Sequence, residues 1–251
     1  MNKTNVTALA RLRQVLPDTP ENEPVYFLAL SRGGRFFLDD PSNPTALAAC
    51  SSTGRKVCHI RALDADPQKD WAALIEKIAP DGALCGDFKL LRTLASQVGY
   101  CAPTEEVVYA QKGKIRLKAP LAEKIRTYSP TVFELVDKNA PWLWDGFPDA
   151  GAALKTHPAF AVKNQGRIVA IAMVCSFSYK WAQIAYWVHN DYRLKGLATR
   201  CAAALTAYLN QRGYGVVALT DESHALSQSI IRKLGLYEAK RMGFSPKRCA
   251  E

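Results

Sequence analysis

The sequence has no long apolar segment. A membrane-spanning helix needs about 20 consecutive apolar residues, whereas the longest apolar run here, Ile168 to Cys175, has the length of a buried strand. The first residues, Met1 to Asn5, lead into a polar and basic stretch instead of the apolar core of a signal peptide. We therefore expect a cytoplasmic protein without a membrane partner.

The cysteines lack the spacings of metal and disulfide motifs. They number seven, an odd count, and no C-x-x-C spacing occurs among them. The sequence therefore suggests neither a disulfide framework nor a zinc site, and we interpret most cysteines as small buried apolar residues. A single cysteine nucleophile stays an alternative, although no cysteine lies in a local catalytic signature.

Charged residues are scattered, and no block of five or six lysines and arginines occurs. The formal net charge is +10, and 48% of the residues are hydrophobic, as in a folded protein with a basic surface. Such a surface attracts polyanions, among them nucleic acid, acidic lipid headgroups and nucleotide cofactors. The charge does not choose among these partners, and a basic surface that is only solvated fits as well.

The order of elements predicts an α/β protein with two domains, residues 1–103 and 104–251. In the first domain, Val25–Leu30 and Arg35–Leu38 are β-prone runs around Gly33-Gly34, a pattern typical of a hairpin. The other elements that we expect there are a strand at Lys56–Ile60 and helices at Asp66–Ile78 and Asp87–Val98. No chemical motif lies in this part of the chain.

The second domain has a clearer pattern. Asn164-Gln165-Gly166 predicts a tight turn between two strands, and apolar residues at 3.6-residue spacing predict a helix from Leu197 to Asn210. The strands that we expect are Phe160–Lys163, Arg167–Phe177, Ala182–Val188, Gly215–Thr220 and Tyr237–Phe244, and the last helix is Ser223–Leu234.

The loop between the strand ending at Val188 and the helix starting at Leu197 carries the main chemical signal. It reads His189-Asn190-Asp191-Tyr192-Arg193-Leu194-Lys195-Gly196, which is basic and ends in glycine. A helix N-terminus presents free backbone N–H groups and the positive end of the helix dipole, and both attract anions. The glycine lets a phosphate approach the backbone closely. The loop therefore predicts a diphosphate site, although a solvated basic loop also fits, and the sequence has neither G-x-x-x-x-G-K-[ST] nor G-x-G-x-x-G.

Arg193-Leu194-Lys195-Gly196-Leu197-Ala198 resembles the R/Q-x-x-G-x-G/A signature of the GNAT superfamily of acyl-CoA N-acyltransferases. Ser227–Leu236 is similar to a second landmark of that family, a helix that ends in a K-L-G-F-like turn. The resemblance covers Gly151 to Phe244 and implies a GNAT fold, a mixed, mainly antiparallel sheet flanked by helices, after a smaller α/β domain. Gly34–Asp40 is similar to a stretch of bacterial zwittermicin-resistance-type acetyltransferases. Leu94–Tyr100 resembles the end of the C-terminal domain, as in a degenerate GNAT-like half.

The resemblance implies acetyl-CoA as the cofactor. In the family, the strand before the loop is splayed from its neighbour, and its backbone pairs with the pantetheine arm, while the loop amides hold the pyrophosphate. The cofactor-binding residues implied in this way are Trp187, Val188, Arg193, Leu194, Lys195, Gly196, Leu197, Ala198, Thr199 and Ser227.

The residues for acid–base chemistry depart from the family pattern. Gln183 stands where a glutamate often serves as the base, Ile231 where a tyrosine often serves as the acid, and His224 where an asparagine is usual. We take Gln183 and His224 as candidate catalytic residues, with Gln183 orienting a water molecule. His189 and Tyr237 are alternatives, and solvent could also deprotonate the amine.

The resemblance thus implies transfer of an acetyl group from acetyl-CoA to a primary amine. The expected acceptor is an amine-bearing small molecule at Trp142–Phe147, with a tRNA or protein amine as alternatives, and protection against an antibiotic is an analogy. A non-catalytic acyl-CoA-binding regulatory domain is a second possibility. A basic nucleic-acid-associated protein is a third, although no helix-turn-helix, zinc or RNA-binding aromatic signature is present.

Overall fold

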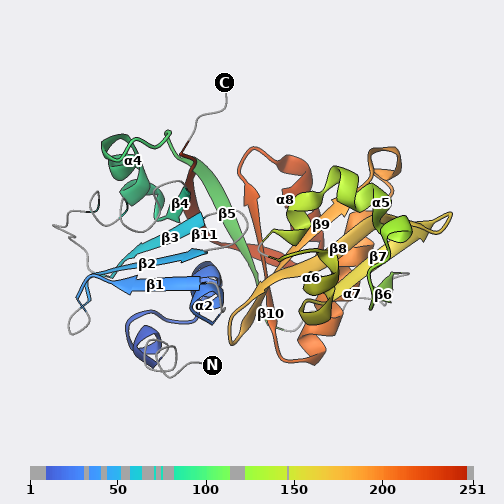
Figure 1. Cartoon of the computed structure of the whole chain (residues 1–251), viewed down its shortest axis with the longest axis horizontal. Helices are drawn as coiled ribbons and strands as arrows, with labels where there is room; N and C mark the ends of the chain where they lie inside the picture. Colours follow the sequence, from blue (N-terminus) through green and yellow to red (C-terminus); the bar gives the residue numbers. More distant parts are fainter. Residues whose placement is uncertain are drawn as a thin grey trace. The chain divides into compact units, whose positions relative to one another are not determined.

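The computed structural model describes residues 10–30, 34–40, 44–51, 57–63, 71, 75, 82–113, 122–145 and 147–247. The chain forms two compact units, and Figure 1 labels their elements. Unit 1 contains Met1–Val108 and Ala239–Glu251, and unit 2 contains Tyr109–Glu238. Both units combine sheet and helices, which confirms the predicted α/β class. Among the residues described, no helix is long and apolar enough to cross a membrane.

In unit 1, the described strands follow the order β1-β2-β3-β4-β11, and β11 (Leu236–Ser245) begins in unit 2 and continues into unit 1. β3 and β4 are parallel, and the other neighbouring pairs are antiparallel. Because side chains alternate along a strand, Ile60 faces an apolar cluster with Leu91, whereas Leu47 faces a second cluster with Tyr26. The bounds of the elements up to the start of unit 2 are η1 Pro20–Asn22, α2 Glu23–Leu30, β1 Gly34–Leu38, β2 Ala46–Ser51, β3 Val57–Ala62, β4 Ala83–Gly86, α4 Phe88–Gln97 and β5 Thr104–Gln111.

The prediction of a strand at Val25–Leu30 is wrong, because this segment is the helix α2. Tyr26 is buried, and its hydroxyl donates to Leu16 O at 2.6 Å. A short apolar run buried on several sides has no periodicity that separates a helix from a strand. β3 and α4 agree with their predicted ranges, while the predicted helix at Asp66–Ile78 lies mostly outside the described residues.

In unit 2, the strands follow the order β10-β9-β8-β7-β6, with the end of β5 beside β10. β9 and β10 are parallel, and β6 to β9 are antiparallel. The predicted elements of this part are present, with ends that differ by at most two residues. The bounds are β6 Glu123–Ile125, α5 Pro130–Asn139, η2 Pro141–Trp144, α6 Ala150–Thr156, β7 Ala159–Asn164, β8 Arg167–Phe177, β9 Trp181–Val188, η3 Asn190–Tyr192, α7 Leu197–Gln211, β10 Gly215–Asp221, α8 Ala225–Lys233 and β11 Leu236–Ser245.

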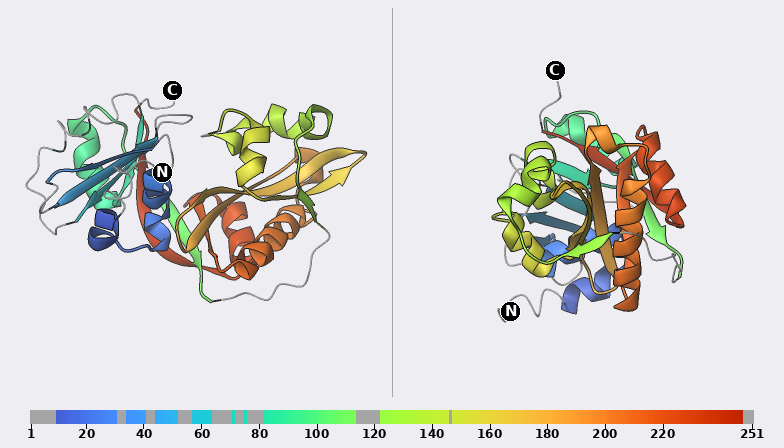
Figure 2. Two further views of the ribbon diagram at one scale, coloured as in Figure 1. Left: turned by 60° about the horizontal axis from the view of Figure 1, so that its bottom comes forward. Right: turned by 90° about the vertical axis from the view of Figure 1, so that its right-hand side faces the viewer.

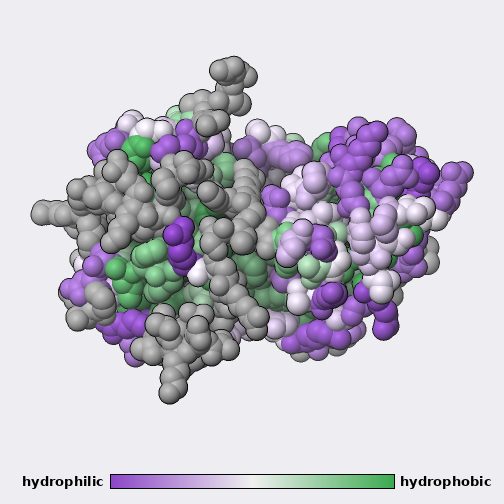
Figure 3. All heavy atoms as spheres, viewed as in Figure 1, coloured by the Kyte–Doolittle hydropathy of each residue, from purple (hydrophilic) through white to green (hydrophobic). Residues whose placement is uncertain are grey.

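Helices cover both faces of the sheet in unit 2. The left view of Figure 2 shows α5 and α6, in green and yellow, on one face and α7, in orange, on the other. Ala185 and Trp187 of β9 belong to the apolar cluster under α5 and α6. The alternating residues Ile184, Tyr186 and Val188 therefore point toward the face with α7 and α8. On the face shown in Figure 3, hydrophilic residues cover α5 and the tip of the β7–β8 hairpin.

Most of the described cysteines follow the prediction, while Cys175 is only partly buried and Cys249 lies outside the described residues. Cys50, Cys58, Cys85 and Cys201 are buried free thiols. Cys101 is disulfide-bonded, so the expectation of no disulfide is wrong for this residue. Its N–H donates to Pro246 O at 3.0 Å, which places it against a segment far away in the sequence. Spacing along the chain does not reveal such a contact.

Candidate functional site

The backbone between β9 and α7 turns tightly within unit 2. The His189 N–H donates to Val169 O at 2.9 Å, which continues the pairing of β9 with β8. The 3-10 turn η3 follows, and the Arg193 N–H donates to Asn190 O at 3.2 Å. α7 then begins at Leu197.

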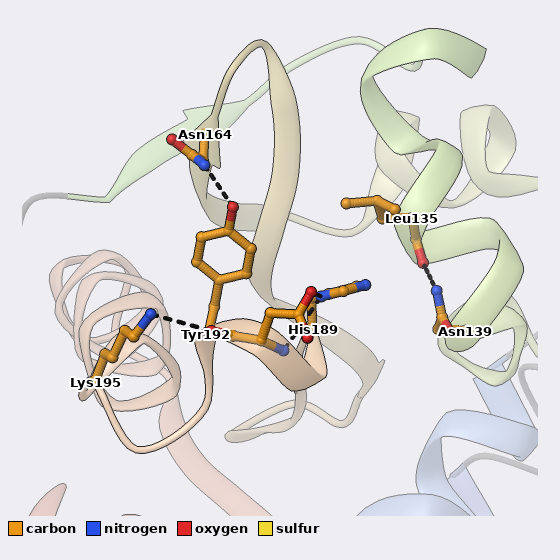
Figure 4. A network of polar contacts seen from close by, with 7 residues as sticks. Leu135, Asn139, Asn164, His189, Tyr192 and Lys195 are labelled. Carbon is orange, nitrogen blue, oxygen red and sulfur yellow. Dashed lines mark hydrogen bonds and ion pairs between the residues drawn. The ribbon is translucent and has the colours of Figure 1, made fainter.

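Side chains hold this loop in place (Figure 4). The Tyr192 hydroxyl accepts a hydrogen bond from Asn164 Nδ2, next to the turn between β7 and β8. Lys195 Nζ donates to Asp191 O at 3.0 Å and lies 5.1 Å from the centroid of the Tyr192 ring. His189 Nδ1 accepts from the Asp191 N–H at 3.4 Å. These contacts tie the loop to β7 and to its own backbone.

The N–H groups of residues 194–199 have no hydrogen-bond acceptor within the described part of the chain. Gly196 is the N-cap of α7 and provides no side-chain cap, and the Arg200 N–H is the first in the helix to bond, to Gly196 O at 3.1 Å. Arg193 differs, because its N–H is already bonded to Asn190 O. Unpaired amides at a helix N-terminus form a site for an anion such as a diphosphate.

Two residues of the loop have left-handed backbone conformations, Leu194 with φ 60° and Gly196 with φ 73°. For leucine this conformation costs about 1–2 kcal/mol, and the Leu194 side chain gains no burial in return, since it is 90% exposed. A Cβ atom added to Gly196 would meet no protein atom within 4 Å, so the space in front of the glycine is open. Backbone strain of this kind is common in loops that bind ligands.

β9 and β10 separate beyond their first three residues. The paired residues are Trp181 with Gly215, Ala182 with Val216 and Gln183 with Val217. Both strands continue, but no further pair joins them in the structure as described. The edge of β9 that faces β10 therefore has no strand partner over five residue steps, which is about 16 Å. An extended ligand can pair with this edge as an added strand would.

The two candidate catalytic residues lie at different places along this gap. Gln183 is at the closed end, where its Oε1 accepts from Ser176 Oγ at 3.5 Å. His224 is exposed and precedes α8, and its side chain makes no cap hydrogen bond. β10 runs four residues beyond Val217 before the loop that contains His224, a rise of about 13 Å. The structure does not bring these two side chains together.

Tyr186 is a polar residue of the gap that the sequence analysis did not identify. Its hydroxyl lies 2.6 Å from Ser227 Oγ and donates to Ser227 O at 3.1 Å, so it contacts α8. Burial raises the pKa of Tyr186, and the hydrogen bond with Ser227 partly opposes the shift. The only sequence signal is a polar-tipped side chain between Ile184 and Val188 in an apolar strand. Nothing in the sequence pairs it with a residue on a later helix.

The aromatic segment around Trp142–Phe147, where we expect the acceptor, contributes mainly to the core of unit 2. Phe133 and Trp144 belong to the apolar cluster on one face of the sheet. Trp144 Nε1 donates to Asp137 Oδ1 at 3.0 Å. Trp142, in contrast, is 47% exposed and can contact a ligand.

Residues 128–237 match the family model described as "Acetyltransferase (GNAT) domain". A curated relative from Streptomyces virginiae, "Uncharacterized N-acetyltransferase in mutA 5'region", is 26% identical over 137 residues. That match covers 52% of this chain and 57% of the relative, so the chain spans little more than half of the relative's length.

Solved structures resemble the chain over nearly its full length. The "GCN5-related N-acetyltransferase-like protein" from Streptococcus suis has a TM-score of 0.68 at 17% identity, covering 95% of this chain and 98% of that one. The "Tandem GNAT protein from the clavulanic acid biosynthesis pathway" has a TM-score of 0.56 at 12% identity, covering 99% and 95%. At these identities the likeness concerns the fold.

Proposed function

We propose that the chain is an N-acetyltransferase of the GNAT superfamily that moves an acetyl group from acetyl-CoA to a primary amine, a proposal supported by the match of residues 128–237 to the acetyltransferase family model. One observation carries this proposal. The N–H groups of residues 194–199 have no protein acceptor among the described residues, and they lie at the N-terminus of α7, directly after the strand whose edge is unpaired.

The proposed cofactor site combines these two features. The amides of residues 194–199 bind the pyrophosphate, and Arg193 and Lys195 add positive charge. The N–H and C=O groups of Val188 pair with the pantetheine arm, as a strand would. The same groups of Trp187, also expected to bind the arm, point toward β8, because they alternate with those of Val188 and share the direction of the His189 N–H, which donates to Val169 O. Thr199 and Ser227 contribute hydroxyl groups at the two helices that border the site.

Acetyl-CoA supplies a reactive thioester when it is bound. The protein holds the amine acceptor next to it, and proximity and orientation of this kind are worth about 7–11 kcal/mol. The Gln183 side chain cannot take up a proton at neutral pH, but its amide can orient a water molecule that does. Gln183 lies at the closed end of the gap, which suits this role, and a role for His224 stays a prediction.

The acceptor is the finer part of the proposal. We expect an amine-bearing small molecule, in line with the resemblance to zwittermicin-resistance-type acetyltransferases, and Trp142 offers it an exposed apolar surface. A tRNA or protein amine would be a different acceptor for the same chemistry.

We also propose that unit 1 is a degenerate GNAT-like half. In unit 1, β3 and β4 are parallel over three residue pairs, from Val57 with Ala83 to His59 with Cys85. In unit 2, β9 and β10 are parallel over three pairs as well. Each parallel pair follows an antiparallel meander and precedes a helix, α4 in one unit and α8 in the other.

A calorimetric titration with acetyl-CoA, followed by a panel of amines, tests the proposed function. Gly196→Glu should abolish binding, because it places a side chain and a negative charge at the diphosphate site. Gly213→Glu is the matched control, since Gly213 follows the C-terminus of α7, has φ 84°, and has no atom within 4 Å of an added Cβ, as at Gly196. If the wild-type protein shows no affinity for coenzyme A, the proposal is wrong. Binding without acetylation of any amine would favour a non-catalytic acyl-CoA-binding domain.

A further inference from the structure

The proposed reaction releases a thiolate, and that sulfur must gain a proton. A thiol with a pKa of about 8.5 is a modest leaving group, so an acid next to the sulfur lowers the barrier. Ile231, in the position where the resemblance would put a tyrosine, is buried and has no acidic proton. If the proposed function holds, another side chain must supply this proton.

The unpaired half of β9 offers one acidic side chain toward α8. Ile184 and Val188 share this face with Tyr186, and both are aliphatic. Ala185 and Trp187 point into the opposite apolar cluster.

The Tyr186 side chain reaches from β9 to α8. Its hydroxyl contacts both Ser227 O, at 3.1 Å, and Ser227 Oγ, at 2.6 Å. α8 follows β10 in the chain and packs against it. The side chain therefore spans the gap between the two diverging strands, on the side of the helices. A ligand arm that pairs with the edge of β9 runs past this hydroxyl.

We propose that Tyr186 is the catalytic acid of this acetyltransferase and that Ser227 orients its hydroxyl. The amine nitrogen attacks the thioester carbon, and a C–N bond forms. The C–S bond breaks, the sulfur keeps the electron pair and takes the proton from the Tyr186 hydroxyl. The nitrogen loses its extra proton to water, and water returns a proton to the phenolate.

The surroundings of Tyr186 suit an acid that stays protonated at neutral pH. Burial raises the pKa of Tyr186, and the Ser227 hydrogen bond is the one opposing contribution. No charged side chain of the described residues adds to this shift. The reaction rate should therefore fall at alkaline pH as Tyr186 loses its proton.

Tyr186→Phe tests the proposal directly. We expect kcat to fall about 100-fold, with the dissociation constant for coenzyme A and the KM for acetyl-CoA little changed. The alkaline decrease in kcat that comes from this residue should also disappear. Tyr208→Phe is the matched control, because Tyr208 lies on α7, outside the gap. Its hydroxyl accepts a hydrogen bond from Lys124 Nζ at 2.7 Å.

Ser227→Ala is a second variant that leaves the tyrosine in place. It removes the hydrogen bond that lowers the pKa of Tyr186. The decrease in kcat at alkaline pH should therefore begin at a higher pH, and kcat at neutral pH should fall. If Tyr186 had only a structural role, the pH at which kcat decreases would not change. The inference is overturned if Tyr186→Phe keeps the wild-type kcat and pH profile, or if it loses activity only in proportion to coenzyme A affinity. A wild-type protein without acetylation activity would instead overturn the proposed function itself.

Discussion

Gln183 is the last residue of β9 that pairs with β10, and its partner is Val217. The two strands diverge from this pair onward, so Gln183 marks the closed end of the gap. The loop that we propose as the pyrophosphate site lies at the other end, beyond Val188. In the proposed binding mode, a pantetheine arm that enters at this loop and follows the edge of β9 would end at Gln183, which is why we propose that the reacting groups meet there.

Gln183→Ala should slow turnover without weakening cofactor binding. In its proposed role the side chain orients a water molecule but takes up no proton, so we expect a loss in kcat of about tenfold, below the range typical of a true general base. Steady-state kinetics should show an unchanged KM for acetyl-CoA. Gln183→Glu provides the comparison, because a carboxylate can accept the proton and should make kcat rise with pH. A parallel increase in KM for Gln183→Ala would contradict the assignment.

Leu194→Asn should stabilise the protein. Asparagine tolerates the left-handed conformation better than leucine, and the exposed leucine side chain contributes no core packing. We expect the free energy of unfolding in urea to rise by about 0.5–1 kcal/mol. Leu226→Asn is the control, because Leu226 is an exposed leucine in the helix α8 and should give no such gain. No gain at Leu194 would mean that the φ of 60° is absent in solution.

Sequence patterns predicted unit 2 far better than unit 1. The helix α7 has apolar residues at helical spacing between Gly196 and Gly213, and the hairpin turn has Gln165 and Gly166 at positive φ, so local chemistry defines both elements. α2 was misread as a strand because burial on several sides removes the periodicity that distinguishes the two structures.

The geometry of the site depends on relationships that no local pattern contains. The register that ends at Gln183 and Val217 joins residues 34 positions apart. The contact between Tyr186 and Ser227 joins residues 41 positions apart. The sequence could predict an anion site in the loop because the glycine and the basic residues of the loop are contiguous. Contacts such as the one between Tyr186 and Ser227 form only through the packing of the strands and helices.

The stability of the protein should depend on the protonation of His157. Burial lowers the pKa of His157 to about 4. The centroid of its ring lies 4.7 Å from the ring centroid of Phe147 and 5.3 Å from that of Phe177. An unfolded histidine has a pKa near 6.5, so the unfolded state binds the proton more tightly. The stabilising contribution is complete above about pH 6.5 and is lost as the pH falls toward 4, by up to about 1.4 kcal/mol per pH unit.

Urea unfolding between pH 7 and pH 4 measures this dependence. His157→Gln should flatten the slope below about pH 6.5, while part of the slope remains because burial also lowers the pKa of His59, to about 3. His224→Gln serves as the control, since His224 is exposed. An unchanged slope in His157→Gln would show that the ring is protonated in the folded state.

The side-chain amides of Gln111 and Asn210 bond to each other, and we expect their contributions to the free energy of unfolding to be coupled. Gln111 Nε2 donates to Asn210 Oδ1 at 2.7 Å, and Asn210 Nδ2 donates to Gln111 Oε1 at 2.9 Å, with both residues buried. Asn210→Leu leaves Gln111 Oε1 buried without its donor, and we expect a loss of about 1–3 kcal/mol in the free energy of unfolding.

Combining Asn210→Leu with Gln111→Leu should recover part of that loss, because neither side-chain amide is then left buried without the other. Urea titrations of the single and double variants measure the coupling, and purely additive losses would contradict it. Neither change should alter affinity for coenzyme A, since Asn210 is in the last turn of α7 and the unpaired amides are at its first. A loss of affinity in the double variant at full stability would mean that the position of α7, and not only its N-terminal amides, depends on the contact with β5.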